Sequence, residues 1–184
     1  TGIYECGVDR WGRLWLSAAG SGLYHREGSV WTSFPGPTPG PETFYPTQMI
    51  VGQDRSLWLH WNMRTLARME KTGPVRISLA DYPDLVAMRH LYPGERGPII
   101  TGGGGIGQWR GGRMLLAAGS RMSSLRRLNG VVQTPQGETW GMGPAGIVRV
   151  ATAELERAFE DPEFVPKVKV LDFHDGLPER GQSQ

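Results

Sequence analysis

Short hydrophobic runs bounded by glycine, proline, aspartate or serine recur along the whole chain, and polar residues separate them. In the first 34 residues the runs predict four strands with a tight turn between the first two. The predicted strands are 3–8, 13–17, 22–26 and 29–32, and the predicted turn is 9–12. Because every strand is short and follows closely on the last, the pattern indicates antiparallel sheets joined by hairpins.

The same arrangement recurs three more times, at intervals of about 40 residues. A large hydrophobic residue holds the same place in each copy: Trp15, Trp58, Ile100 and Trp140. Three residues earlier stands a glycine in three of the copies, Gly12, Gly97 and Gly137, whereas Arg55 takes that place in the second. A second pattern, a small residue followed by hydrophobic ones, begins a few residues later, most clearly at Gly22 and Gly146.

A repeat of about 40 residues that contains several short strands is typical of a β-propeller blade. We therefore predict an all-β fold of four blades, each a four-stranded antiparallel sheet, and interpret the repeated tryptophans as packing between blades, with ligand stacking as the alternative. The predicted blades are 1–34, 47–80, 85–118 and 128–173, with 174–184 leading into a further blade. Abundant glycine (27), proline (14) and tryptophan (7) agree with short strands and many turns.

Two longer segments interrupt the repeat. The proline-rich segment 35–46 is interpreted as an irregular connection between the first two blades. In segment 152–161, Leu155, Ala158 and Phe159 are spaced as on one face of a helix, and Thr152 is the expected N-cap. This segment is predicted to be a short helix inserted in the fourth blade.

The first copy, VDRWGRLWLSAAGSGLYHR (8–26), resembles the blade motif of the two-component regulator propeller family. The tail FHDGLPERGQSQ (173–184) resembles the linker that leads into the next blade in that family, while copies two to four match less closely. The resemblance implies a periplasmic, non-catalytic sensor region of a membrane-anchored protein. It further implies a cytoplasmic histidine kinase, hybrid regulator or diguanylate cyclase, and a small-molecule or carbohydrate ligand.

Four blades can close a ring, but an arc of a larger ring leaves two exposed blade faces. We expect the chain to be part of a larger propeller. Its expected partners are the rest of its own signalling chain or another chain, such as a second copy in a homodimer. A propeller enzyme, such as a lyase or a glycan-active enzyme, and an interaction scaffold are the alternative functions, because one fold hosts all three.

The chemistry-bearing residues favour no catalytic, metal or cofactor site. His25, His60, His90 and His174 show no metal-ligand spacing, and the single cysteine, Cys6, excludes a disulfide framework. The net charge of +2 is too small to indicate nucleic-acid binding. The sequence contains no run of 18 apolar residues, so we expect no membrane contact within this segment.

Two further features have two interpretations each. TGGGGIG (101–107) has the spacing of a dinucleotide-binding loop, but its place in the repeat predicts a hairpin between two strands of blade three. No acidic residue lies between Arg96 and Gly137, a stretch with six arginines that either attracts anions or is balanced by acids from other blades. These arginines are Arg96, Arg110, Arg113, Arg121, Arg126 and Arg127.

Overall fold

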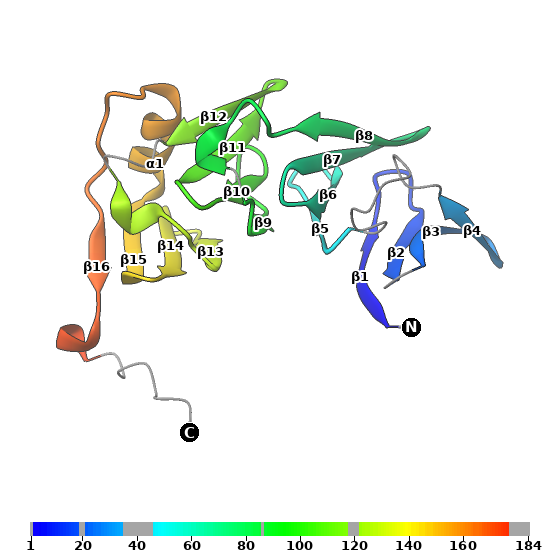
Figure 1. Ribbon diagram of the computed structural model, residues 1–184, viewed down its shortest axis with the longest axis horizontal. Helices are drawn as coiled ribbons and strands as arrows, with labels where there is room; N and C mark the ends of the chain where they lie inside the picture. Colours follow the sequence, from blue (N-terminus) through cyan, green and yellow to red (C-terminus); the bar gives the residue numbers. More distant parts are fainter. Residues whose placement is uncertain (1, 19–20, 35–45, 86, 118–121, 177–184) are drawn as a thin grey trace.

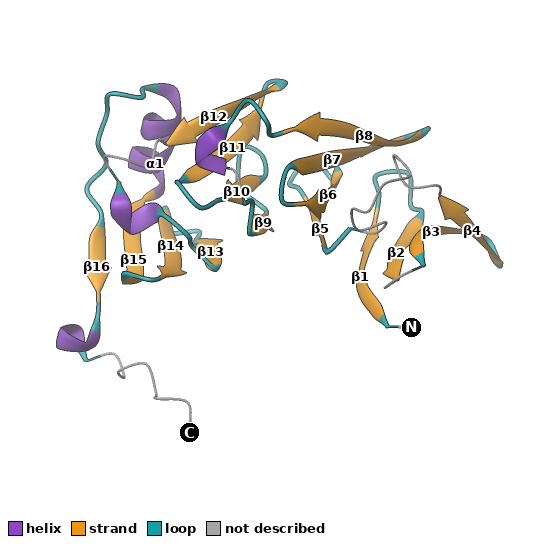
Figure 2. Ribbon diagram, in the orientation of Figure 1, coloured by secondary structure: helices purple, strands orange, loops and turns teal. Residues whose placement is uncertain are grey.

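The structure, a computed structural model, describes residues 2–18, 21–34, 46–85, 87–117 and 122–176. Within these ranges sixteen strands form four antiparallel sheets of four strands each, so the predicted all-β propeller-blade fold is confirmed. The proline-rich segment 35–46 falls almost entirely outside the described residues. Figure 2 shows how strands dominate the fold.

Each blade is a meander of consecutive strands. Blade one contains β1 (Ile3–Val8), β2 (Leu14–Ala18), β3 (Gly22–Glu27) and β4 (Val30–Phe34). Blade two contains β5 (Gln48–Val51), β6 (Leu57–Asn62), β7 (Thr65–Glu70) and β8 (Gly73–Ser78). Blade three contains β9 (His90–Tyr92), β10 (Ile99–Thr101), β11 (Ile106–Arg110) and β12 (Arg113–Ala117). Blade four contains β13 (Gly130–Gln133), β14 (Glu138–Gly143), β15 (Gly146–Ala151) and β16 (Lys169–Leu171).

The predicted helix is present as α1 (Thr152–Glu160), between β15 and β16 of blade four. The predicted N-cap is wrong, because Ala151 holds that position and no side chain caps the helix. Thr152 is the first helical residue, and its hydroxyl lies 2.9 Å from the Thr139 hydroxyl inside the blade. The helix contacts β12 of blade three as well as β14 and β15, so it bridges two blades. No helix in the described part of the chain is long and apolar enough to cross a membrane.

The four blades follow one another in an open arc. The first strands of consecutive blades contact each other, β1 with β5, β5 with β9 and β9 with β13. Blades one and four lie at opposite ends of the arc (Figure 1). These blades therefore do not meet to close a ring, and each presents one sheet face without a neighbouring blade.

Hydrophobic clusters fill the three junctions between consecutive blades, which we number by the blades they join. Junction 1–2 contains Trp15, Leu23, Met49, Leu57, Leu59, Trp61, Ala67 and Met69. Junction 2–3 contains Trp58, Leu66, Leu79, Leu85, Met88, Leu91, Ile100 and Met114. Junction 3–4 contains Ile99, Ile106, Leu128, Val148, Val150, Leu155 and Phe159, among others. Burial of these side chains is the main source of stability, because apolar area removed from water stabilises by about 25 cal/mol per Å².

The third blade departs from the sequence repeat by one residue. Trp15 and Trp58 lie at the junction with the following blade, whereas Ile100 lies at the junction with the preceding one. The residue of blade three that faces forward is Ile99. Seven residues separate Gly7 from its ladder partner Trp15, but only six separate Tyr92 from Ile99. Because side chains alternate across a sheet, this one-residue difference exchanges the two faces of β10.

Hydrogen bonds across the junctions agree with this alignment. Ser17, two residues after Trp15, donates its hydroxyl to the carbonyl of Pro46, just before blade two. Thr101, two residues after Ile99, donates its hydroxyl to the carbonyl of Leu128 at 3.0 Å, just before blade four. These side chains tie each blade to the start of the next.

Candidate binding cleft between blades two and three

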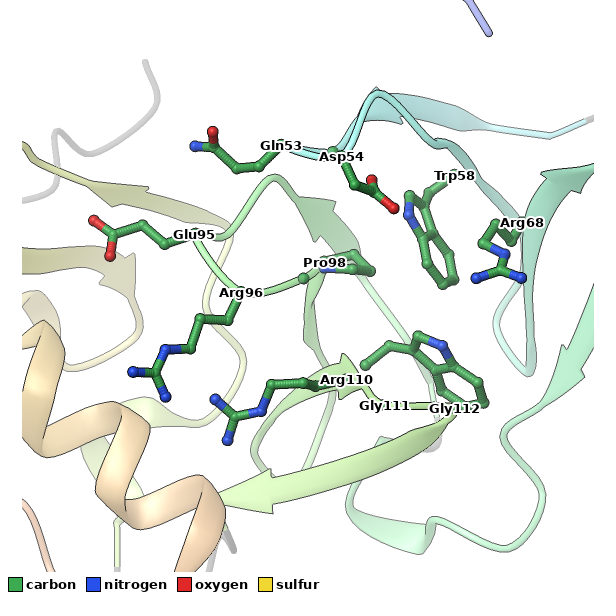
Figure 3. Close-up of a pocket in the computed structure, with 13 residues that line it drawn as sticks. Gln53, Asp54, Trp58, Arg68, Glu95, Arg96, Pro98, Arg110, Gly111 and Gly112 are labelled. Carbon is green, nitrogen blue, oxygen red and sulfur yellow. The ribbon is translucent and has the colours of Figure 1, made fainter. Parts of the chain in front are cut away.

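A cleft of about 310 Å³ opens at junction 2–3, beside the turns that join the strands (Figure 3). This volume lies at the lower end of the usual range for small-molecule sites, roughly 300–1,000 Å³. Its lining comes from three turns and the strand ends beside them: Gly52, Gln53, Asp54, Trp58, Arg68, Glu95, Arg96, Gly97, Pro98, Trp109, Arg110, Gly111 and Gly112. Backbone, aromatic and charged groups thus surround the same cleft.

The cleft exists because a bulky side chain of junction 1–2 has no counterpart at junction 2–3. The Arg13 guanidinium reaches the next blade and donates to the carbonyls of Glu70 and Lys71, in the β7–β8 hairpin. In the turn of blade one, Asp9 N–H donates to Arg13 C=O, and in the turn of blade two, Gly52 N–H donates to Ser56 C=O. Ser56 therefore holds the position in blade two that Arg13 holds in blade one. Serine is too short to span the junction, and its hydroxyl instead accepts a hydrogen bond from Arg10 and donates one to Asp54.

The hairpin that faces this space is the equivalent of the one that binds Arg13. Glu70 pairs with Gly73 across a two-residue turn in blade two, and Arg110 pairs with Arg113 across Gly111 and Gly112 in blade three. The carbonyls of Arg110 and Gly111 therefore correspond to those of Glu70 and Lys71. Because neither glycine carries a side chain, the hairpin backbone lies directly against the cleft.

Two tryptophans form the aromatic side of the cleft. The rings of Trp58 and Trp109 meet edge to face, with centroids 6.3 Å apart. The Arg68 guanidinium lies 5.9 Å from the Trp58 ring centroid, a cation–π geometry, and forms an ion pair with Glu70 at 2.5 Å. Trp58 is only 3% exposed, so almost all of its indole is packed within the junction.

Carboxylates line the upper part of the cleft in Figure 3, with Asp54 beside Trp58. Burial acts to raise the pKa of Asp54, but hydrogen bonds from the Ser56 hydroxyl and amide, with the charge of Arg10, together lower it. Asp54 is consequently ionised at neutral pH. Glu95 makes no salt bridge with any described residue, and its backbone N–H donates to Gln133 at 2.8 Å.

The arginines of blade three are largely neutralised by α1. Arg110 donates to Glu156 and Glu160 at 2.8 Å each, and Arg96 lies 3.4 Å from Glu160. Figure 3 shows both guanidinium groups turned toward the helix. Acids from blade four therefore balance these two charges, which is one of the two interpretations of the arginine stretch. Arg121 lies outside the described residues.

The glycines of the repeat hold turn positions that need positive φ. Gly12 and Gly137 have φ of 82° and 78°, and Arg55 adopts 60° at the corresponding turn of blade two. Gly22 and Gly146, at the starts of β3 and β15, have φ of 107° and 114°. Gly97, in the shorter turn of blade three, has φ of 146°.

The large residue of the fourth copy, Trp140, lies half-buried on the outer face of blade four. Its indole N–H donates to Glu138 at 3.1 Å, and the Arg149 guanidinium lies 5.6 Å from its ring centroid. Val132, its ladder partner, is 58% exposed. This face is the counterpart of those by which Trp15 and Trp58 contact the next blade.

The histidines do not come together. His25 stacks on Trp15, with ring centroids 4.8 Å apart, and His60 is buried in β6. Burial and the charge of Arg89 lower the pKa of His90. Burial also raises the pKa of its neighbour Tyr92 to about 12. His174 is exposed, and no cluster of three metal-binding side chains occurs in the ranges that the structure describes.

The glycine-rich segment 101–107 is a hairpin between β10 and β11. No helix follows it, so the dinucleotide-binding interpretation is wrong. A Cβ on Gly102 would lie 2.6 Å from the Cα of Leu85, and one on Gly104 would lie 2.9 Å from the Cα of Asp84. The glycines allow this hairpin to pack against the 3₁₀ helix at Pro83–Leu85.

The sequence did not reveal the cleft. The sequence does contain the difference that accompanies the cleft, an arginine (Arg13) in the turn of blade one and a serine (Ser56) at the equivalent position of blade two. No sequence pattern indicates, however, that Arg13 reaches the next blade. That contact follows only from how the blades stack.

Comparison with known proteins finds likeness in structure and not in sequence. No family model matches the chain, and no curated protein is significantly similar to it. The fold is similar to the extracellular domain of a hybrid two component system of B. thetaiotaomicron, BT3049, with a TM-score of 0.63 and 11% identity over 96% of this chain. It is also similar to that of a one component system of this organism, BT4673, with a TM-score of 0.62 and 14% identity over 91% of this chain.

The chain also resembles virginiamycin B lyase of Staphylococcus aureus. The TM-score is 0.62 at 13% identity for a catalytically inactive variant with quinupristin, over 94% of this chain. The chain spans 57% of the length of that lyase and 23% of the length of each of the two extracellular domains. At these identities the likeness establishes the propeller-blade fold alone.

Proposed function

We propose that the chain is a ligand-binding region of an extracytoplasmic sensor propeller, which passes a ligand signal to a cytoplasmic output domain of the two-component type. The observation that carries the proposal is the cleft at junction 2–3, where three turns of a propeller arc place charged and aromatic groups around one space. The fold shared with two extracellular domains of signalling systems supports it. A ligand bound between two blades contacts both, so its binding can change their relative position.

The complete gene product, reconstituted in lipid vesicles, tests this proposal. We expect a membrane segment and a signalling domain in the complete product, and an output activity that changes when a ligand from a panel of saccharides, amino acids and amines is added outside. Asp54→Asn should weaken the response, whereas Asp161→Asn, at the C-terminal end of α1, should not. A complete product without a membrane segment or a signalling domain would contradict the proposal.

A propeller enzyme is the second candidate, favoured by the similarity to virginiamycin B lyase. This candidate predicts that the chain converts quinupristin, the molecule named with that structure, into a product of different mass or chromatographic mobility. Incubation of the purified chain with quinupristin, followed by mass spectrometry, separates the candidates. Time-dependent loss of the parent compound would favour the enzyme.

A further inference from the structure

We propose that the cleft at junction 2–3 binds the cationic group of a small ligand, a guanidinium or a primary ammonium, where the Arg13 guanidinium lies at junction 1–2. The inference rests on the proposed ligand-binding function and gives the chemical class of the ligand. The protein itself supplies the template, because the two junctions are built from equivalent turns.

At junction 1–2 the template is complete. Arg13 Nε donates to Asp9 Oδ2 at 2.7 Å. Its Nη1 and Nη2 donate to the carbonyls of Lys71 and Glu70 at 2.9 and 3.1 Å. The guanidinium carbon lies 5.2 Å from the centroid of the Trp15 ring. A carboxylate, a pair of hairpin carbonyls and an indole thus surround one cation.

Junction 2–3 offers the same three kinds of group, with Ser56 in place of Arg13 and with the Arg68 guanidinium 5.9 Å from the Trp58 ring centroid. Trp58 holds the ladder position of Trp15, and the Arg110–Arg113 hairpin holds that of the Glu70–Gly73 hairpin. Gly52 replaces Asp9, but Asp54 folds back over it, so that Oδ1 lies 3.0 Å from where a Cβ on Gly52 would be. The Asp54 carboxylate therefore lies close to the place that the Asp9 carboxylate takes in blade one, although it comes from a different position in the turn.

The charges in the cleft favour a cation. The arginines that line it are engaged by acids: Arg68 by Glu70, and Arg96 and Arg110 by Glu156 and Glu160. Asp54, which pairs with Arg10 at 3.4 Å, and Glu95 are the carboxylates among the lining residues. Asp54 accepts hydrogen bonds from the Ser56 amide and hydroxyl and lies 3.4 Å from the Arg10 guanidinium, which also donates to the Ser56 hydroxyl. Because the Asp54 side chain is 61% exposed, its carboxylate keeps lone pairs for a ligand.

Other ligand classes fit the groups less well. Hairpin carbonyls and carboxylates accept hydrogen bonds, so a bound group has to donate several, as a guanidinium or an ammonium does. An anion would face these acceptors directly. A neutral sugar would need an open ring face for stacking, whereas Trp58 is 3% exposed and Arg68 already lies over its ring.

The first experiment adds methylguanidinium or L-arginine to the purified chain and follows tryptophan fluorescence and amide NMR shifts. We expect saturable binding at concentrations on the order of millimolar for so small a probe. The shifts should centre on Trp58, Trp109 and the Gly111–Gly112 turn. Asp54→Asn should weaken binding about tenfold or more, because a charge-assisted hydrogen bond is lost.

Ser56→Arg is the decisive variant, because it places a guanidinium of the protein in the cleft. It should abolish binding of the added probe and leave the chain folded. Ser29→Arg adds the same charge at an exposed turn and should bind the probe normally. Retained binding in Ser56→Arg, in a folded variant, would overturn the proposal.

Arg13→Ser provides a readout that does not depend on the folding of Ser56→Arg. It opens an equivalent space at junction 1–2, so methylguanidinium should raise its melting temperature more than that of the parent chain. Rescue of this variant without binding at junction 2–3 of the parent chain would show that the probe works and that the assignment of the cleft is wrong.

The outcomes separate this inference from the proposed function. If a saccharide or an anion binds and changes the output activity while guanidinium and amines do not bind, the ligand class is wrong and the sensor function stands. If guanidinium binds at junction 2–3 but the complete gene product has no output domain, the ligand class stands and the sensor function fails.

Discussion

The side-chain amide of Gln48 in β5 and the backbone of Leu91 in β9 are joined by two hydrogen bonds of 2.8 Å, one in each direction. The bonds link the first strands of blades two and three, next to the fully buried Leu91 side chain. An amide side chain that replaces a missing strand partner in this way ties the two sheets together at junction 2–3.

We predict that Gln48→Leu destabilises the chain by about 2 kcal/mol, because both backbone groups of Leu91 lose their partner. Chemical denaturation measures the change. Gln53→Leu, at an exposed turn position, serves as the control and should differ from the parent chain by less than about 0.5 kcal/mol. An equal midpoint for both variants would contradict the role of the link.

Arg55 supports a second prediction, since it adopts φ of 60° where blades one and four have glycine. A side chain in this region costs about 1–2 kcal/mol, and glycine removes that cost at some expense in chain entropy. Arg55→Gly should therefore stabilise by about 0.5–1 kcal/mol. Arg113→Gly, in a strand, should destabilise by a similar amount, and a thermal melt of both variants would show opposite signs.

The third prediction concerns Asp9, which should make the free energy of unfolding depend on pH. Burial acts to raise its pKa, but hydrogen bonds from Trp15 and Arg13 and the Arg13 charge together lower it. A lowered pKa means that Asp9 contributes stability above its unfolded-state value, near 3.9, and loses it as the pH falls through the folded-state value. Asp9→Asn should cost about 2 kcal/mol at pH 7.

The difference between Asp9→Asn and the parent chain should shrink as the pH falls from about 5 toward 3. Urea midpoints across this range provide the measurement. A constant difference from pH 7 to pH 3 would show that the ionised carboxylate is not what stabilises the turn.

The acids of α1 make a matched pair for a fourth prediction. Glu156 is buried and bonds both Gln108 and Arg110, while Glu160 is 56% exposed at its side chain. Glu156→Ala should cost about 3 kcal/mol, because it leaves Arg110 and Gln108 without this partner. Glu160→Ala should cost less than about 1 kcal/mol. Equal losses on denaturation would mean that burial does not separate the two ion pairs.

The glycine-rich hairpin gives the fifth prediction. Gly102→Ala should destabilise by about 2 kcal/mol, because its Cβ would overlap the backbone of Leu85. Gly130→Ala is the control, since its nearest contact would be Met142 at an ordinary 3.8 Å. Comparable melting temperatures for the two variants would be evidence against the close approach.

The sequence predicted the blade fold and the helix because both depend on local patterns. Strand spacing and turn residues repeat every 40 residues, and Leu155, Ala158 and Phe159 mark one helix face. In blade one the predicted strand 13–17 lies at Leu14–Ala18, one residue further along. Strand ends are set by ladder hydrogen bonds, which composition does not reveal.

The sequence could not supply what depends on contacts between blades. Ile100 aligned with the tryptophans, yet the shorter turn before β10 places Ile99 on the forward face. The arginine stretch kept two interpretations because the acids that pair with Arg96 and Arg110, Glu156 and Glu160, lie some 50 residues away in α1. The cleft itself required knowing which hairpin Arg13 reaches.

The open arc also determines how the molecule is expected to unfold. In an array where each unit contacts only its neighbours, cooperativity passes through every junction in series. Junction 2–3 contains a cleft where junction 1–2 contains a bridging arginine, so we expect it to separate before junction 1–2. Denaturation should therefore separate blades one and two from blades three and four, as two transitions that a ligand in the cleft would merge into one.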